Sequence, residues 1–126
     1  MPKTAFDTVK VAGAPYSTAI KVGTTLYVSG QVPLDGKTGK LVAGDIKAQT
    51  SQVFANLKDA LAKAGMSLGH VVKATVFMTD LGDFGAMNEV YARHMPAPHP
   101  ARSTVQVAGL PLGAKLEIEV IADERA

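Results

Sequence analysis

The sequence reads PARSTVQVAGLP from Pro100 to Pro111, and this stretch decides the fold of the C-terminal third. A proline opens it, polar and apolar residues alternate through its middle, and a Gly/Pro turn closes it, which together predict one short β-strand. Because successive side chains of a strand point to opposite faces, Arg102, Thr104 and Gln106 share one face. We expect this polar face to point away from the core.

The segment 115–122 alternates in the same way and predicts a second strand, paired with the first in a hairpin. Its Leu, Ile and Val residues face the core, whereas Glu117 and Glu119 face away from it. If the turn is centred at 109–110, the register sets Arg102 opposite Glu117 on the non-core face. Alternation alone leaves two interpretations open: a solvated ion pair contributing at most about 1 kcal/mol, or a functional pair.

Length and composition bound the class of protein. The 126 residues, 47% of them hydrophobic, predict a single domain over 1–126 with a real core. There is no cysteine, so disulfides, thiol nucleophiles and thiolate metal sites are excluded. The net charge of +2 is spread along the chain without a block of like charges, which argues against a nucleic-acid partner. No stretch approaches the ~18 apolar residues of a membrane span, so we expect a soluble cytoplasmic protein.

The remaining segments predict an α+β fold in the order βββαβαββ. Strands are expected over 4–11, 16–22, 25–29 and 71–78, and helices over 45–64 and from Asp83 to the proline-rich stretch 96–100. Asp83 is expected to cap this second helix, which carries Asn88 on an otherwise apolar stripe that includes Phe84 and Tyr91. Both helices can cover one face of a mixed sheet of about six strands. The other face stays bare and half apolar, which is most simply explained by association with copies of the same chain.

The sequence contains no recognisable motif for binding a metal or a phosphate group. His70, His94 and His99 have no Glu or His at zinc-ligand spacing, so we interpret them as surface residues. The glycines between 36 and 44 lack the Lys-Ser/Thr and the strand-to-helix setting of a phosphate loop. We therefore expect no metal, no nucleotide and no other cofactor.

Several stretches together resemble the RidA/YjgF family of reactive-intermediate deaminases over nearly the whole length. They are APYSTAI at 14–20, YVSGQVPL at 27–34, Asp45, Gln49-Thr50, Asn56-Leu57, VKATVF at 72–77, Asp83-Phe84, MNEVY at 87–91, PARSTV at 100–105 and GLP at 109–111. The resemblance implies a chorismate-mutase-like fold, with a sheet backed by two helices. It also implies a homotrimer whose sheets form a central barrel, with ligand sites in the clefts between subunits.

The same resemblance implies an activity and a set of site residues. Members of the RidA type hydrolyse enamine and imine intermediates, such as 2-aminoacrylate and 2-iminobutyrate, to 2-oxo acids and ammonia without a cofactor. By resemblance, Arg102 clamps the substrate carboxylate and Glu117 orients the attacking water. The other expected site residues are Tyr16, Ser29 and Gly30 at a strand end, Asn88 on the second helix, and Thr104. Two positions depart from the family pattern at the expected rim of the site: Ala14 replaces a common glycine and Thr18 a common glutamine.

The residue types suit this chemistry. An arginine fork matches a carboxylate in a bidentate way that lysine does not. A carboxylate such as Glu117 can accept a proton from water that adds to a C=N bond. Two other functions stay open on the same scaffold: binding of 2-oxo acid-like molecules or of a protein without turnover, and, ranked last because the chain has no basic track, RNA cleavage.

Overall fold

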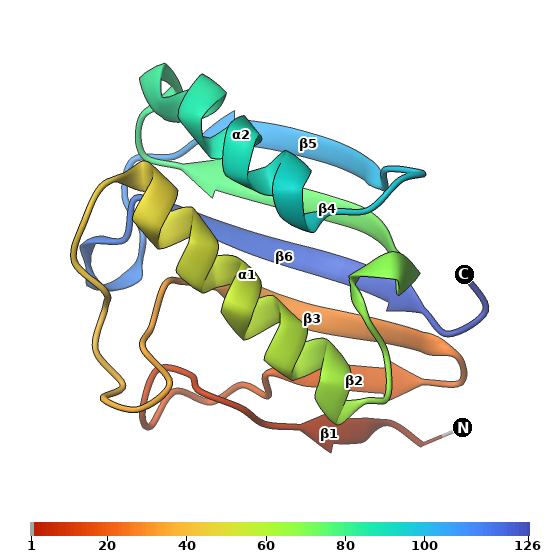
Figure 1. Cartoon of the computed structure of the whole chain (residues 1–126). Coiled ribbons are helices and arrows are strands. Elements are labelled where there is room, and N and C mark those ends of the chain that lie inside the picture. The colour runs from red at the N-terminus through yellow and green to blue at the C-terminus, as the bar shows by residue number, and fades with distance from the viewer. Residues whose placement is uncertain (1) are drawn as a thin grey trace.

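The structure is a computed structural model that describes residues 2–126, and it shows one six-stranded mixed sheet covered on one face by two helices (Figure 1). The strands are β1 (Thr4–Phe6), β2 (Ala19–Val22), β3 (Thr25–Gln31), β4 (Val71–Met78), β5 (Ala101–Gln106) and β6 (Leu116–Asp123). The helices are α1 (Ile46–Lys63) and α2 (Phe84–His94), with short 3-10 turns η1 (Leu68–His70), η2 (Leu81–Asp83) and η3 (Pro111–Gly113). The predicted α+β class and the order βββαβαββ are confirmed. Within residues 2–126, no helix is both long and apolar enough to cross a membrane.

Helix α1 forms where the sequence carries both of its end signals. The Asp45 carboxylate accepts a hydrogen bond from the Ala48 N–H at 2.9 Å, which satisfies one free donor of the first turn. Gly65, with φ of 73°, takes the left-handed conformation that ends many helices. Between these ends the helix buries an apolar stripe, including Phe54 and Leu57, against the sheet. This packing forms the main core.

The strand order across the sheet is β1-β2-β3-β6-β4-β5 (Figure 1). Strands β4 and β5 run parallel and are joined through α2, as a crossover connection requires. Strand β6 lies between β3 and β4 and is antiparallel to both. The last strand of the chain therefore occupies the interior of the sheet rather than its edge.

The predicted hairpin between the last two strands is wrong. Arg102 lies beside Ala74 of β4, and Glu117 pairs with Phe77 on the other edge of that same strand. Alternation and turn residues mark where strands begin and end, but they do not select the partner strand. The connection 107–115 instead carries the chain past β4 into the gap beside β3, where Ile118 of β6 is fully buried.

The two strands also present their polar residues to opposite sides of the sheet. Strand β5 aligns its polar residues with buried residues of β4, in the pairs Ala74–Arg102, Val76–Thr104 and Met78–Gln106. Paired residues share a face, so Arg102 points to the helix-covered side, contrary to our prediction. Glu117 alternates with the buried Leu116 and Ile118 and points to the bare side, as predicted. Within one chain, Arg102 and Glu117 therefore cannot face each other.

The bare face is mixed, as expected, although Arg102 is not part of it. Tyr27 is 51% exposed there, and Val105 at the edge strand is also exposed. The register places Tyr27 beside Ile121 and Phe77 beside Glu117. The uncovered sheet surface thus carries both apolar and acidic side chains.

The chain between β1 and β2 is less regular than predicted. The first strand ends at Phe6, and the second begins at Ala19. Between them, the Thr8 N–H donates to Thr18 Oγ1 and the Thr18 N–H donates to Asp7 Oδ1, both at 3.0 Å. These side chains replace strand pairing as partners for the backbone.

Two further predictions need correction. Asp83 stands at the start of α2 but makes no capping hydrogen bond, whereas Asp80 accepts one from the Gly82 N–H. Among the histidines, His94 is half-buried, with its ring stacked on Phe54, and is not a simple surface residue. Local sequence spacing did not indicate that Asp80 would make the hydrogen bond or that the His94 ring would stack on α1.

Asn56 on α1 fixes the segment that leaves β3. Its side-chain amide is buried and donates to the carbonyls of Val32 and Leu34, at 3.1 and 2.9 Å. Its own carbonyl oxygen accepts from Gln52. Since the end of β3 lies next to these carbonyls, Asn56 ties the helix to that strand end.

We predict that Asn56→Ala lowers the free energy of unfolding by about 1–3 kcal/mol, because two buried hydrogen bonds are lost together. Asp59→Ala on the exposed side of α1 is the control and should change it by less than about 0.5 kcal/mol. Urea unfolding at fixed protein concentration measures both. Equal effects of the two substitutions would contradict the stabilising role given to the Asn56 hydrogen bonds.

Candidate active site

Arg102 lies in a pocket of about 330 Å³ between α2 and the start of β5, which we call the Arg102 pocket. Its guanidinium donates a hydrogen bond to Asn88 Oδ1 at 2.7 Å. The guanidinium carbon also lies 4.7 Å from the centroid of the Tyr91 ring and 5.6 Å from that of Phe84. Contacts of this kind attract a cation and fix the plane of the fork. The pocket is lined by Asn88, Tyr91, Ala92, His99, Pro100 and Arg102.

The positive charge of Arg102 is not matched by an acid. In the described part of the chain, the ion pairs join Lys10 to Asp7, Lys21 to Glu124, Lys47 to Glu89 and Arg125 to Asp123, and none includes Arg102. Asn88 and the two rings hold the guanidinium but leave its charge uncompensated. An oriented arginine in a pocket without a carboxylate is a binding site for an anionic group.

Two buried hydroxyls near this arginine, Tyr91 Oη and Thr104 Oγ1, make no hydrogen bond of good geometry among residues 2–126. Burial raises the pKa of the Tyr91 phenol, and the charge of Arg102, together with a weak contact of its guanidinium with the phenol oxygen, opposes that rise. Native proteins rarely leave buried hydroxyls unpaired, and such groups often mark a functional region.

A second pocket, of about 460 Å³, contains the other expected site residues and is called the Glu117 pocket. It lies where β3 bulges: Val28 pairs with Val120 and Gln31 with Ile118, so Ser29 and Gly30 share the space of one residue on β6. Bulges re-aim side chains and are common beside active sites. The lining residues are Val11, Ala14, Tyr16, Ser29, Gly30, Val32, Pro111, Glu117 and Glu119.

Gly30 makes room for the Glu117 carboxylate. A Cβ at position 30 would lie 2.3 Å from Glu117 Oε2 and 2.6 Å from its carboxyl carbon. The glutamate therefore occupies the space that any other residue at position 30 would fill with its side chain. The bulge and the glycine together set the position of the carboxylate.

Burial raises the pKa of the Glu117 carboxyl above its usual range, and the negative charge of Glu119 adds to the rise. No lysine or arginine in the described chain pairs with Glu117. A raised pKa makes this carboxylate a better proton acceptor than an exposed glutamate.

Tyr16 is held by the segment that precedes it. Its hydroxyl accepts a hydrogen bond from the Val11 N–H at 3.0 Å, and the Lys10 ammonium lies 5.2 Å from the centroid of its ring. Because the hydroxyl oxygen already accepts, its proton stays available for donation to a ligand. Ser29 differs, since its hydroxyl donates to the Ser17 carbonyl at 2.7 Å and helps to fix the bulge.

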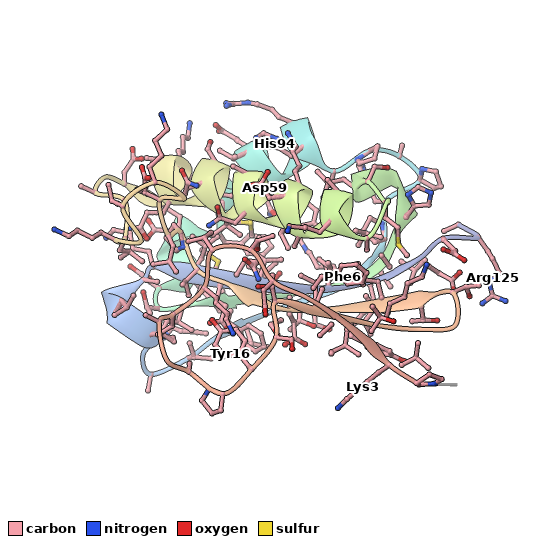
Figure 2. All side chains as sticks on the ribbon, turned by 90° about the horizontal axis from the view of Figure 1, so that it is seen from below. Lys3, Phe6, Tyr16, Asp59, His94 and Arg125 are labelled. Atoms are coloured by element: carbon pink, nitrogen blue, oxygen red, sulfur yellow. The ribbon has the colours of Figure 1, made fainter. Side chains whose placement is uncertain are left out.

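The structure therefore brings the expected residues together in two groups rather than one. Arg102, Asn88 and Thr104 lie on the helix-covered side of the sheet. Tyr16, Ser29, Gly30 and Glu117 lie around the second pocket. Figure 2 shows Tyr16 on the side of the sheet away from the helices and His94 on the helical side. The chain thus carries two separate groups of candidate residues.

Sequence reasoning missed two aromatic residues and misplaced a third position. Phe84 and Tyr91 were assigned only to the apolar side of α2, although their spacing of four and three residues from Asn88 puts all three on one face. Ala14 does line the Glu117 pocket, as expected. Thr18, expected at the rim, is instead fully buried, where it binds the backbone of the preceding segment.

Comparisons with known proteins identify the family. A family model described as Endoribonuclease L-PSP matches residues 8–124. The crystal structure of RidA from the Antarctic bacterium Psychrobacter sp. PAMC 21119 superposes with a TM-score of 0.88 at 47% identity, covering 94% of this chain and 95% of that one. The chain belongs to the RidA/YjgF family.

Curated relatives within this family carry different names. Protein DfrA of Myxococcus xanthus is 49% identical over 118 residues, which is 92% of this chain and 90% of that protein. The mouse 2-iminobutanoate/2-iminopropanoate deaminase is 45% identical over 108 residues, which is 86% of this chain and 80% of that protein. Membership of the RidA/YjgF family supports a Rid-type function, while the activity of this chain has to be argued from its site.

We predict that Gly30→Ala lowers the pKa of the Glu117 carboxyl, because the added Cβ displaces it from its buried position toward water. Carbon-detected NMR of labelled glutamate carboxyls measures this pKa. Gly85→Ala is the control, since a Cβ there meets no atom within 4 Å and should leave the Glu117 titration unchanged. An unchanged pKa in Gly30→Ala would contradict the role given to this glycine.

Proposed function

We propose that this protein hydrolyses 2-imino acids and their enamine tautomers, such as 2-iminobutyrate and 2-aminoacrylate, to 2-oxo acids and ammonia. The observation that carries the proposal is the Arg102 guanidinium, oriented by Asn88 and two aromatic rings and free of any carboxylate in the described chain. The substrate carboxylate supplies the missing negative charge. A relative named 2-iminobutanoate/2-iminopropanoate deaminase supports this substrate class.

The reaction needs an oriented C=N carbon, a water molecule and a group that moves protons. Arg102 binds the carboxylate and so fixes the adjacent imine carbon. The Glu117 carboxylate takes a proton from water while the water oxygen forms a bond to that carbon, and it passes this proton to the imine nitrogen to give the carbinolamine. Glu117 then takes the proton of the carbinolamine hydroxyl and gives it to the same nitrogen, while the C–N bond breaks with its electron pair moving to nitrogen, which yields the 2-oxo acid and ammonia.

The raised pKa of Glu117 fits both halves of this cycle. The carboxylate must first accept a proton from water and later return it to the departing nitrogen. A carboxyl whose pKa lies well below neutrality would be a weak base, and burial beside Glu119 moves the pKa of Glu117 in the useful direction. Tyr16 is placed to donate its hydroxyl proton in the same pocket.

We further propose that the complete site forms between two copies of the chain, in a trimer. Arg102 and Glu117 lie on opposite sides of one sheet, so the two half-sites of a single chain cannot act on one small substrate. A cyclic assembly can bring the Arg102 pocket of one copy to the Glu117 pocket of the next. The partly apolar bare face, with Tyr27 and Val105 exposed, offers a surface for such contact.

The test of the proposed function is an imine-lifetime assay. A threonine dehydratase generates the imine, and its disappearance is followed with and without the protein. We predict that Arg102→Ala lowers kcat/KM by about 100-fold or more, because the substrate is no longer oriented. Arg102→Lys should also be defective, since lysine keeps the charge but lacks the fork.

Arg93→Ala, at an exposed position of the same helix α2, is the matched control and should retain wild-type rates. Acceleration that survives in Arg102→Ala would overturn the assignment. A wild-type protein that is stabilised by 2-oxobutyrate but leaves the imine lifetime unchanged would instead indicate binding without turnover.

A further inference from the structure

A third pocket, of about 400 Å³, opens on the helical side of the molecule and is not used by the proposed reaction. We call it the Lys58 pocket. It lies between the second half of α1, the end of α2 and the turn η1. Its lining residues are Lys58, Ala62, Met66, Ser67, Leu68, Gly69, His94 and Pro96. Met66 and Leu68 are buried and form an apolar floor.

Lys58 and His94 form a polar pair at this pocket. The Lys58 ammonium lies 3.1 Å from His94 Nδ1, close enough to donate a hydrogen bond to the ring. The imidazole is stacked on Phe54, with ring centroids 5.0 Å apart and planes 11° apart. Burial lowers the pKa of His94, and the charges of Lys58 and Arg93 add to the effect. A lowered pKa favours the neutral imidazole, whose Nδ1 can accept a hydrogen bond from Lys58 at this distance.

The residues that line this pocket carry no negative charge, since none of them is an aspartate or a glutamate. None of the ion pairs in the described chain includes Lys58. Among the titratable neighbours of the lining residues, His70 accepts a hydrogen bond from the Ser67 N–H at 3.0 Å, Arg93 is a cation, and Asp59 lies outside the lining on the exposed side of α1. An ammonium has three donors, and a bond to His94 leaves two of them free.

We propose that the Lys58 pocket binds a small monocarboxylate with a short apolar tail. The carboxylate accepts from Lys58, and the tail lies on the Met66 and Leu68 floor. A cation at the mouth with an apolar base matches that ligand at both of its ends. Phosphate would meet the same ammonium but would gain nothing from the apolar floor.

This site is separate from the proposed active site. Lys58 lies on α1, and no residue that lines its pocket also lines the Arg102 pocket or the Glu117 pocket. The inference does not depend on the proposed deaminase activity.

The experiment uses full-length protein with methyl-labelled methionine in an Arg102→Ala background, which removes the other proposed carboxylate site. Butyrate is the probe, and butyramide, of the same shape without the charge, is the matched ligand control. We expect the Met66 methyl signal to shift saturably with butyrate, while the fully buried Met78 of β4 does not respond. Butyramide should give no saturable shift in the same range.

A second pair of variants tests the cation. Lys58→Met should weaken butyrate binding by about tenfold, as expected for the loss of a hydrogen bond between charged groups. Lys63→Met, on the same helix but outside the pocket, should leave the affinity unchanged. The proposal is overturned if butyrate does not shift Met66, if butyramide shifts it equally, or if Lys58→Met binds butyrate as well as the parent protein.

Discussion

The insertion of β6 between β3 and β4 is the constraint on which the rest of this structure depends. Because β6 is antiparallel to both neighbours, its buried residues close the centre of the sheet while Glu117 is turned to the bare side. Strand β5 is then confined to the edge, parallel to β4, with Arg102 turned toward α2. One topological choice thus separates the cation and the carboxylate by the thickness of the sheet.

In each of the two pockets, one charged side chain has no partner of opposite charge in the described chain. Arg102 is held by an amide and two rings, none of which carries a negative charge. Glu117 is partly buried beside Glu119, with no basic partner among the described residues. Unpaired charges in partly buried places lower stability and are typical of functional sites. A direct Arg102–Glu117 ion pair would remove both charges and fill the place of the substrate carboxylate.

Much of the fold could be predicted from local patterns. The helix over residues 45–64 carries a capping aspartate, an apolar stripe and a terminal glycine, and each signal acts within a few residues. The strand over 71–78 was equally clear from its composition. The partner of β5 could not be predicted in this way, because alternation is the same whether a strand pairs in a hairpin or across a crossover. The side of the sheet that Arg102 faces follows from that pairing and was missed with it.

The site residues were named through resemblance rather than through spacing. Their division into two groups needed the register, because Arg102 and Glu117 are close in sequence and in sheet position yet face opposite ways. The aromatic support of Arg102 was accessible from sequence, since Phe84, Asn88 and Tyr91 lie within one helical face. The bulge at Ser29 and Gly30 was not, because a strand-end glycine gives no indication of which side chain will occupy its free space.

The central claim is that each working site takes Arg102 from one copy and Glu117 from another. The direct measurement is the imine-hydrolysis rate of mixed oligomers, made by refolding equal amounts of Arg102→Ala and Glu117→Gln protein together. Random mixing in a cyclic assembly leaves about a quarter of the sites with both native groups, so about a quarter of the wild-type rate is predicted. A mixture no more active than the mean of the two separate variants would contradict the account.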